Sequence, residues 1–394
     1  MEYQELKECA KYSNLRTSTF TKDTYISTEN MLPNKGGVTS IDSIPTCKTM
    51  AKYEPADILI SNIRPYFCKI WFATREGGCS NDVLVIKTKK ELYPRFLYYV
   101  LSDKNFFNYA TITSKGTKMP RGNKNAIMKY LVPKISPVTQ QKIASILSVY
   151  DRLIESNTRR IRLLEQMAEN LYKEWFVRFR FPEHENVEMV NGLPKGWKTI
   201  HIKELAQLKS GYAFKSEWFV EEGEAVAKIK DIGNILMDTS NFSYVDKENC
   251  IKAKKFLLTT GDLTIALTGA TIGKISIVPK HKGNIYTNQR LGKFFLGDNP
   301  MEKLPFLYCL FKQESMVSNI VNLSNSSSAQ PNISPEQIEK IKILGNHDII
   351  SMYNKTCNPL FSNILALYSQ NQLLTRQRDL LLPRLMSGKL EVKL

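Results

Sequence analysis

The sequence contains the same arrangement of residues twice, about 210 positions apart. Residues 57–60 match residues 262–265, and further along Met119-Pro120 corresponds to Gln330-Pro331. The offset grows slowly from 205 to 211, as expected if loops of unequal length separate the matching elements. A repeat limits the fold before any motif does, because both copies must form similar structures. We therefore expect two related domains in one chain.

Each copy ends in a segment whose seam residues are spaced alternately by four and three positions, the pattern of a coiled-coil helix. The first seam consists of Ile143, Leu147, Tyr150, Ile154, Asn157, Ile161, Leu164, Ala168, Leu171 and Trp175. The second, 210 positions later, consists of Tyr353, Cys357, Leu360, Ile364, Leu367, Asn371, Leu374, Arg378, Leu381 and Leu385. We expect Pro383 to end the second helix near Leu382, and Pro359 either to kink that helix or to start its main part.

Asn157 lies in the middle of the otherwise apolar first seam. A single buried asparagine often fixes the partner and register of a coiled coil. The other interpretation is a half-exposed position near a frayed contact. The sequence leaves both open for Asn157 and for Asn371 on the second seam.

The seams also predict the fold class. A helix of ~33 residues spans ~50 Å, and such a seam is not stable unpaired in water. The simplest partner for each helix is the matching helix of the other copy. We therefore expect an α+β fold. Two tandem mixed α/β domains would be separated by two long helices, which pair as an antiparallel coiled coil about a pseudo-two-fold axis. The predicted segments are a first domain at 1–136, a helix at 137–178, a second domain at 179–345, and a C-terminal helix and tail at 346–394.

Within the domains, β-branched runs at 82–88 and 272–278 predict strands, and segments 91–101 and 301–313 predict helices. Two DNA-binding domains held apart by a rigid pair of helices could each contact one half-site on one face of a DNA duplex. The alternative is a coiled coil used only for oligomerisation, which the duplication of the whole domain disfavours.

The charge favours a polyanionic partner, because 55 Lys and Arg residues against 38 Asp and Glu residues give a net charge of +17. A basic surface kept for solubility is the alternative.

The seven cysteines form no CxxC pair, which disfavours a disulfide framework or a structural zinc site. The polar first residues do not fit a signal peptide, and the apolar runs are shorter than the ~20 residues of a membrane helix. We expect a soluble, cytoplasmic protein with no membrane partner.

No catalytic motif is recognisable, so we predict no catalytic residues and no metal ligands. The segment from Gly269 to Lys274 has three residues between its glycines and Ile275 after the lysine, so it does not match a phosphate-binding loop. The four histidines are scattered, without an HExxH or triad-like setting. A basic, duplicated chain of this kind is better interpreted as a DNA binder. The alternatives are a stand-alone nuclease or methyltransferase, and a coiled-coil adaptor without DNA function.

Several short segments resemble the specificity subunits of Type I restriction-modification systems, and the resemblance covers almost the whole chain. In the second domain the segments that carry it are residues 192–197 (GLPKGW), 211–216 (GYAFKS), 228–232 (KIKDI), 267–273 (LTGATIG) and 330–334 (QPNIS). In the helices they are residues 140–147 (QQKIASIL), 175–177 (WFV) and 378–388 (RDLLLPRLMSG). Each segment alone is weak evidence for the family, but their order along the chain and their duplication make the resemblance specific.

The resemblance implies two target-recognition domains, each reading one half of a bipartite site in double-stranded DNA. It implies helices that set the gap between the half-sites and dock two modification subunits, which methylate adenine. No cofactor is implied in this chain. S-adenosylmethionine would bind the modification subunits, and ATP and Mg²⁺ would be used by restriction subunits. Whether two restriction subunits join the complex is left open.

The first domain departs from the family pattern. Ala10-Lys11-Tyr12 occurs where Gly211-Tyr212-Ala213 would be expected, and residues 62–66 replace the Gly-Ala-x-Ile-Gly turn. We interpret this difference as two domains that read different sequences.

Candidate DNA contacts are polar or basic side chains in loops, because Arg and Lys suit guanine, Asn and Gln suit adenine, and hydroxyl and basic groups suit phosphates. For each, a solvated surface position is the alternative. In the first domain they are Thr28, Asn30, Asn62, Arg64, Lys115, Thr117, Lys118 and Arg121, the last four in a segment expected to be a flexible basic loop. In the second domain they are Tyr212, Lys215, Lys230, Thr268, Arg290, Ser327, Ser328 and Gln330.

Candidate contacts to the modification subunits are expected on the exposed faces of the two helices. They are Arg159, Arg160, Glu165, Trp175, Phe176 and Arg384. For Trp175 and Phe176 the alternative is that they only cap the coiled coil.

Overall fold

The computed structural model describes residues 2–41, 43–46, 48–324 and 331–387. The chain divides into two compact units, Met1–Ile154 with Leu373–Leu394, and Glu155–Gln372. We call them unit 1 and unit 2 and describe each by itself. Each contains one mixed domain and a part of both long helices.

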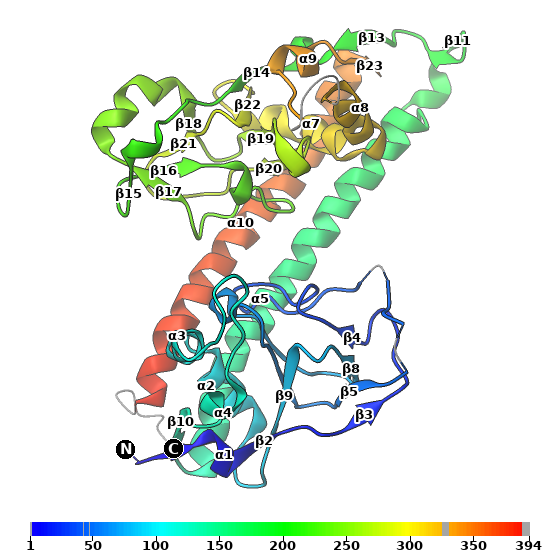
Figure 1. The fold of residues 1–394 in the computed structure, drawn as a ribbon. Coiled ribbons are helices and arrows are strands. Elements are labelled where there is room, and N and C mark those ends of the chain that lie inside the picture. Colours follow the sequence, from blue (N-terminus) through cyan, green and yellow to red (C-terminus); the bar gives the residue numbers. More distant parts are fainter. Residues whose placement is uncertain (1, 42, 47, 325–330, 388–394) are drawn as a thin grey trace. The chain divides into compact units, whose positions relative to one another are not determined.

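The two long helices expected from the seams are present (Figure 1, α5 in green and α10 in orange to red). Helix α5 is Pro137–Tyr172, and a π-helical turn at Lys173–Val177 follows it. Helix α10 is His347–Met386, so it passes through Pro359 and does not start there. The expectation that Pro383 ends this helix was wrong. A proline so close to the end removes only one of the last backbone hydrogen bonds, and Ser387 N still donates to Pro383 O at 3.0 Å.

Unit 1 contains two four-stranded sheets and a two-stranded pairing. The first sheet has the order β2-β9-β6-β7, with strands Ala10–Tyr12, Val83–Thr88, Ile58–Ser61 and Ile70–Phe72. The second has the order β3-β5-β8-β4, with strands Arg16–Thr17, Met50–Tyr53, Gly77–Cys79 and Tyr25–Ile26. Strand β1 (Glu2–Glu5) pairs antiparallel with β10 (Leu131–Lys134). The short helices are α1 (Leu6–Cys9), α2 (Pro94–Ser102), α3 (Lys104–Ile112) and α4 (Lys124–Ile127).

Unit 2 contains the same plan. Its four-stranded sheet has the order β14-β22-β19-β20, with strands Gln207–Ser210, Leu291–Phe295, Leu263–Ala266 and Ile275–Ile277. Its five-stranded sheet has the order β15-β17-β16-β21-β18, with strands Phe219–Val220, Ser243–Val245, Glu224–Ala227, Ile285–Thr287 and Leu257–Leu258. Strand β13 (Lys198–His201) pairs with β23 (Lys342–Gly345), and β11 (Met189–Val190) pairs with β12 (Leu193–Pro194). The short helices are α6 (Ile202–Leu205), α7 (Leu304–Lys312), α8 (Glu314–Ser324) and α9 (Pro335–Glu339).

The duplication predicted from the sequence is therefore confirmed at the level of topology. The order β2-β9-β6-β7 in unit 1 corresponds strand by strand to β14-β22-β19-β20 in unit 2, and β1·β10 corresponds to β13·β23. Each unit contains a parallel pair of strands, β4·β8 in unit 1 and β16·β21 in unit 2. Two mixed domains built on one plan, each containing parts of the same long helices, confirm the coarse α+β prediction.

The predicted local elements match the structure closely. Segment 82–88 forms β9 and segment 91–101 forms most of α2, while segment 301–313 contains α7. Segment 272–278 forms only the three-residue strand β20, because the turn that begins at Gly269 continues through Gly273, which has a φ of 79°.

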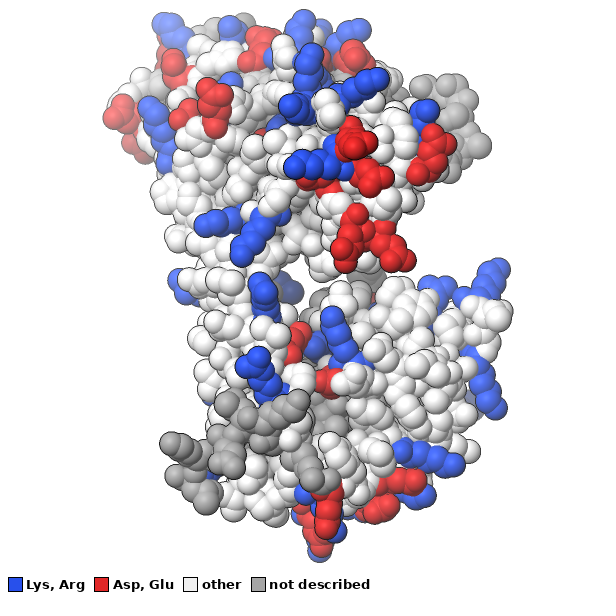
Figure 2. All heavy atoms as spheres, turned by 90° about the vertical axis from the view of Figure 1, so that its left-hand side faces the viewer, with Lys and Arg blue, Asp and Glu red and all other residues white. Residues whose placement is uncertain are grey.

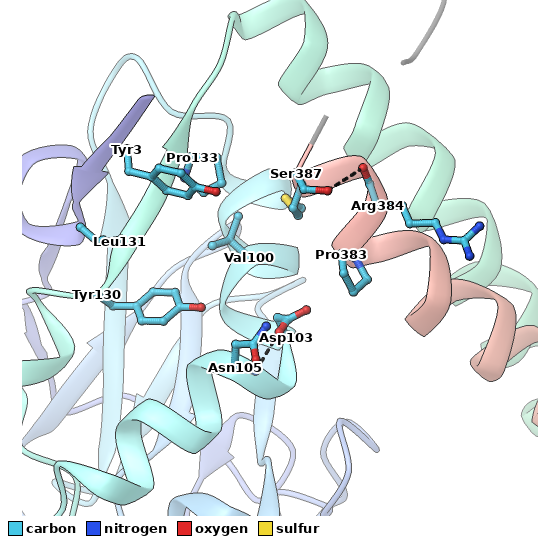
Figure 3. Close-up of a pocket in the computed structure, with 11 residues that line it drawn as sticks. Tyr3, Val100, Asp103, Asn105, Tyr130, Leu131, Pro133, Pro383, Arg384 and Ser387 are labelled. Carbon is cyan, nitrogen blue, oxygen red and sulfur yellow. Dashed lines mark hydrogen bonds between the residues drawn. The ribbon is translucent and has the colours of Figure 1, made fainter. Parts of the chain in front are cut away.

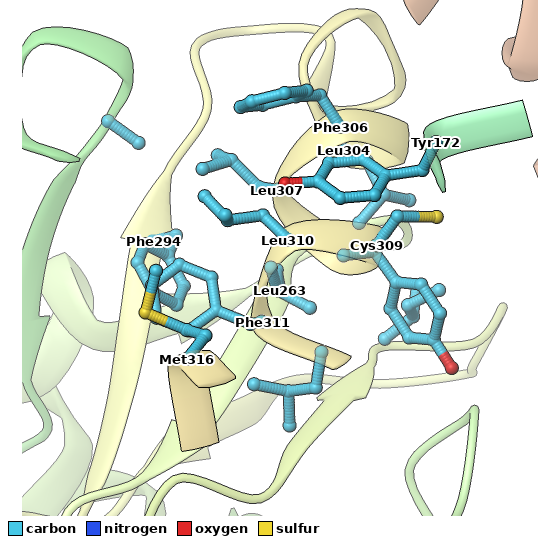
Figure 4. Close-up of a cluster of buried hydrophobic side chains, with 14 of the residues drawn as sticks. Tyr172, Leu263, Phe294, Leu304, Phe306, Leu307, Cys309, Leu310, Phe311 and Met316 are labelled. Atoms are coloured by element: carbon cyan, nitrogen blue, oxygen red, sulfur yellow. The ribbon is translucent and has the colours of Figure 1, made fainter. Parts of the chain in front are cut away.

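The core of unit 2 shows why the seam residues are apolar. Helix α7 is buried along its whole length except Lys312, with Phe306, Tyr308 and Phe311 at most 1% exposed (Figure 4). Seam residues such as Ile161, Ala168, Tyr353 and Ile364 belong to the same cluster. Burial of this apolar surface supplies the dominant favourable term for folding. Among the described residues, no helix is long and apolar enough to cross a membrane.

Candidate nucleic-acid interface

The candidate DNA contacts of the first domain gather around the β6–β7 loop, residues 62–69. Backbone hydrogen bonds join this loop to the segment 114–122: Arg64 N donates to Pro120 O at 2.8 Å, and Gly122 N donates to Asn62 O at 2.9 Å. Lys115 and Arg121 exchange two backbone hydrogen bonds of 2.9 Å. The basic segment is thus joined by its backbone to the β6–β7 loop, which brings Asn62, Arg64, Lys115 and Arg121 together.

Two polar atoms in this place are buried without a hydrogen-bond partner among the described residues, Asn62 Oδ1 and Arg64 Nε. Asn62 itself is only 8% exposed. A buried unpaired polar atom costs free energy, so it is usually found where another molecule or a functional constraint explains it. Lys115, Thr117, Lys118 and Arg121 are exposed, and Arg121 Nη2 lies 3.3 Å from Asp82 Oδ1.

Asn30 does not have the free side chain that a base contact needs. It is 4% exposed, its Nδ2 donates to Tyr25 O and Thr39 O, and its Oδ1 accepts from Ser27 N at 2.6 Å. These bonds hold its own loop together, so the structure assigns the residue an internal role. Thr28 is partly exposed, and its carbonyl accepts from Lys69 Nζ.

The second domain repeats the loop arrangement. Its β19–β20 loop, residues 267–274, is joined to the segment 331–333: Gly269 N donates to Pro331 O at 3.0 Å, and Thr268 bridges to Asn332. The corresponding bridge in the first domain is Ile63 to Arg121. Thr268 is therefore part of the structural counterpart of the first cluster. Ser327, Ser328 and Gln330 lie outside the described residues.

The other second-domain candidates lie on loops of the same unit. Tyr212 is half-buried with its ring stacked at 13° on Trp218, and Lys215 Nζ lies 5.4 Å from the Trp218 ring. Lys230 is exposed and donates to Asn241 O at 2.8 Å, and Arg290 is exposed. The loops thus present cations and aromatic rings together, a combination found at nucleic-acid surfaces.

Asp231, next to Lys230, is a buried carboxylate. It is 4% exposed, and its Oδ2 accepts from Lys228 N at 2.8 Å. Burial raises the pKa of Asp231 to about 6, against the lowering effects of that hydrogen bond and of Lys230. Because its folded-state pKa lies above the ordinary 3.8, the folded protein holds this proton more tightly than the unfolded chain does. Stability from this group is therefore greatest below pH 3.8 and is lost as the pH rises through about 6.

Asp231→Asn should remove that pH dependence, since the amide oxygen can still accept from Lys228 N. We expect the variant to be more stable than the parent by about 1–2 kcal/mol at pH 8, with little difference near pH 4. Urea unfolding at both pH values measures this. The matched control is Asp246→Asn at an exposed position. Equal differences at both pH values would contradict the explanation.

The basic side chains do not gather in one patch on the face shown in Figure 2. On the face shown in Figure 2, basic and acidic side chains are interspersed between larger areas that are neither. The net charge of +17 alone therefore does not outline a binding surface on this face, and the loop clusters define the candidate interface better.

In each unit, polar side chains of α5 and α10 pair with one another. In unit 2, Asn157 is 7% exposed and its Nδ2 donates to Asn371 Oδ1 at 3.0 Å, while Asn371 Nδ2 donates to Thr158 Oγ1. Of the two interpretations, the half-exposed position is therefore wrong for Asn157. In unit 1, Arg378 Nη1 lies 2.7 Å from Asp151 Oδ1, and Tyr99 OH donates to Asp151 Oδ2.

Three of the six predicted docking residues are not on an exposed face. Trp175 and Phe176 are 5% and 8% exposed and pack on Tyr353. Glu165 accepts from Tyr308 OH and pairs with Lys312 Nζ at 3.2 Å, with 14% of its side chain exposed. The prediction was wrong for the exposure of all three. Trp175 lies on the seam itself, and the heptad pattern, which marks one apolar face, does not show that Tyr353 and α7 cover Phe176 and Glu165.

Arg159, Arg160 and Arg384 are exposed as predicted. Arg384 lies at the rim of a cavity of about 740 Å³ in unit 1, lined also by Tyr3, Val100, Tyr130 and Pro383. In Figure 3 the Arg384 guanidinium extends away from those side chains. Asp103, Asn105 and Ser387 also line this cavity.

Comparisons with known proteins agree on one family. The family of Type I restriction modification DNA specificity domains matches residues 3–166 and 194–344. The chain is 27% identical to the Type I restriction enzyme MjaIX specificity subunit of Methanocaldococcus jannaschii, over 77% of this chain and 71% of that protein. It is 25% identical to the Type I restriction enzyme HindI specificity subunit of Haemophilus influenzae, over 93% and 94% of the two chains.

The fold is similar to the crystal structure of a Type I restriction-modification system S subunit from M. genitalium. The TM-score is 0.54, with 18% sequence identity over 98% of this chain and 95% of that one. A mixed domain that occurs twice, with long helices shared between the copies, defines a class of duplicated two-domain proteins. Within that class, this chain belongs to the family of Type I restriction modification DNA specificity domains.

Proposed function

We infer that this chain is the DNA specificity subunit of a Type I restriction-modification complex, and that each mixed domain reads one half of a bipartite DNA target. The observation that carries this inference is the duplicated loop cluster. Each domain joins its central strand–turn–strand loop to a second polar loop, through the bridges Ile63 to Arg121 and Thr268 to Asn332. The family match to both copies supports it. We propose 1–136 and 179–345 as the two target-recognition domains.

We further propose that α5 and α10 pair as an antiparallel coiled coil, which relates the domains by a pseudo-two-fold axis. Contacts within unit 2 support opposite directions: Tyr353 OH donates to Ala168 O, whereas Asn371 further along α10 meets Asn157 earlier on α5. Within unit 1, Arg378 meets Asp151, which continues the trend. Such a pair would act as a spacer of fixed length between the half-sites.

The exposed arginines of the helices, Arg159, Arg160 and Arg384, are proposed contacts to two modification subunits. The chain would hold no cofactor and catalyse nothing itself. S-adenosylmethionine would bind the modification subunits, and ATP with Mg²⁺ would serve restriction subunits where these are present. Among the described residues, no group of three or more His, Cys, Asp or Glu side chains is arranged to hold a metal ion.

A methylation readout tests the proposal. DNA from cells that express this chain with its modification subunit should carry a split motif, two short half-sites around a fixed gap, methylated at adenine on both strands. Replacing residues 179–345 by the same domain of a relative should change one half-site only, since each domain reads independently. A change in both halves, or no methylated motif from a complex shown by co-purification to assemble, would contradict it.

A further inference from the structure

The β6–β7 loop of the first domain has an unusual backbone. Arg64 and Cys68 adopt left-handed conformations, with φ of 50° and 51°, on either side of the 3-10 turn Pro65–Phe67. Asn34 and Lys35, with φ of 54° and 61°, pack against the same turn: Asn34 N donates to Phe67 O at 2.9 Å and Lys35 N to Cys68 O at 3.0 Å. Left-handed residues other than glycine are strained, and such strain gathers at functional sites.

The second domain shows that the backbone shape is shared and the side chains are not. At the repeat offset of 205, Arg64 and Cys68 correspond to Gly269 and Gly273, which have φ of 78° and 79°. Glycine adopts this conformation without strain. The first domain therefore has the same turn, but it carries an arginine at a position where glycine would adopt the left-handed backbone conformation without strain. Tyr66 and Phe67 replace Thr271 and Ile272.

Those two aromatic rings are exposed. Tyr66 is 49% exposed and Phe67 is 38% exposed, whereas the corresponding Ile272 is 8% exposed. The rings contact each other with centroids 4.8 Å apart. Two adjacent exposed rings on a turn held rigid by backbone hydrogen bonds are costly in water, so they point to a partner that covers them.

The charges around the rings favour DNA as that partner. Lys69 Nζ lies 5.9 Å from the Phe67 ring, and Lys35 and Lys104 are close enough to Cys68 to lower its thiol pKa, although burial, the larger effect, raises it. Arg64 and the basic segment 114–122 adjoin the turn through the bond from Arg64 N to Pro120 O. Acidic groups nearby are Glu29, close to Lys69, Asp379, which pairs with Lys35, and Asp82, which pairs with Arg121.

We propose that Tyr66 and Phe67 form an aromatic wedge with which the first recognition domain contacts a base step of its half-site, while the neighbouring cations hold the phosphates. This proposal rests on the proposed function and names one contact by which the first domain would recognise its half-site. Apolar side chains that enter a base step unstack it and read its deformability. Asn62, whose Oδ1 is buried without a partner among the described residues, would complete its hydrogen bonding beside the wedge.

The test uses the full chain with its modification subunit and a duplex that carries the motif found by the methylation readout. 2-Aminopurine is placed at successive positions of each half-site. Apart from the target adenines, which the modification subunits flip out of the stack for methylation, we expect fluorescence with the parent chain to rise on binding at one step of one half-site only. With Tyr66→Ala/Phe67→Ala we expect that rise to disappear and the affinity to fall about ten-fold or more.

The matched control is Cys68→Gly, which relieves the backbone and keeps both rings. It should bind like the parent and unfold at the same or a higher temperature. The double variant must also unfold near the parent's temperature, since its rings lie on the surface. If it is destabilised, Tyr66→Thr/Phe67→Ile, which installs the second domain's own residues, should show the same loss of fluorescence and affinity.

Unchanged affinity and fluorescence in the double variant would overturn the wedge while leaving the specificity function in place. Loss of co-purification with the modification subunit, with DNA affinity kept, would overturn it in favour of a protein contact. Failure of the parent complex to bind any motif duplex would remove the proposed function itself and the wedge with it.

Discussion

Replacing Trp175 with alanine is expected to destabilise the folded chain by about 3–5 kcal/mol, as removal of a large buried aromatic side chain generally does. Trp175 is 5% exposed in the π-helical turn after α5, and its ring meets Tyr353 edge-on with centroids 5.7 Å apart. Tyr353 in turn donates to Ala168 O at 2.7 Å. Truncation would therefore open a cavity where the start of α10 packs on the end of α5.

Urea unfolding of the purified chain measures this effect. Val177→Ala is the matched control, because Val177 lies two residues away in the same turn and is 59% exposed. It should change stability by less than about 0.5 kcal/mol. If Trp175→Ala were as stable as this control and lost only its association with the modification subunit, the sequence-based assignment of Trp175 as a docking residue would be restored.

The seams illustrate how far the sequence predicts this fold. Alternating spacings of four and three identify helices, and a matching pattern 210 positions later identifies a duplication, because both depend on periodic burial. The same pattern cannot show what covers a helix elsewhere. Phe176 and Glu165 were therefore assigned to an exposed face, although Tyr353 and α7 bury them. Trp175 was assigned there although it lies on the seam itself.

The positions of the loops that carry the candidate DNA contacts were predictable, but the directions of their side chains were not. Turn residues and basic side chains marked the β6–β7 loop, the 114–122 segment and the β19–β20 loop. Side-chain direction was not predictable, so Asn30 was chosen although its polar atoms are used within its own loop. Tyr66 and Phe67 were missed because their exposure depends on left-handed Arg64 and Cys68, a conformation that the sequence signals only through glycine. Comparison with Gly269 and Gly273 in the second copy would have been the available signal.

Arg378→Ala is expected to destabilise the chain by about 2 kcal/mol, because it breaks a largely buried charge network in unit 1. Arg378 lies on the second seam with 13% of its side chain exposed, and its guanidinium meets Asp151 at 2.7 Å and Asp379 at 2.9 Å. Burial lowers the pKa of Arg378, but Asp379 and Asp151 together outweigh it and the net shift is upward. Removing the arginine would leave Asp151 with Tyr99 OH as its remaining partner in this network.

Equilibrium unfolding measures the loss, with Arg376→Ala as the control at an exposed position on the same helix. The control should be nearly neutral. The loss at Arg378 should persist at raised ionic strength, since salt screens buried pairs much less than exposed ones. A loss that vanished in salt would show that the network acts as a surface ion pair.

The network also bears on why the two helices meet each other and not copies of themselves. At the repeat offset of 210, Arg378 corresponds to Ala168 and Asp151 corresponds to Phe361, so this polar pair has no counterpart in unit 2. If α5 paired with a second α5 in the same register, Asp151 would face alanine. A second α10 would set Arg378 against Phe361. An unpaired charge in a seam is strongly unfavourable, so Arg378 and Asp151 favour the pairing within one chain. Arg378→Ala should therefore also raise the fraction of dimer in sedimentation experiments, whereas Arg376→Ala should not.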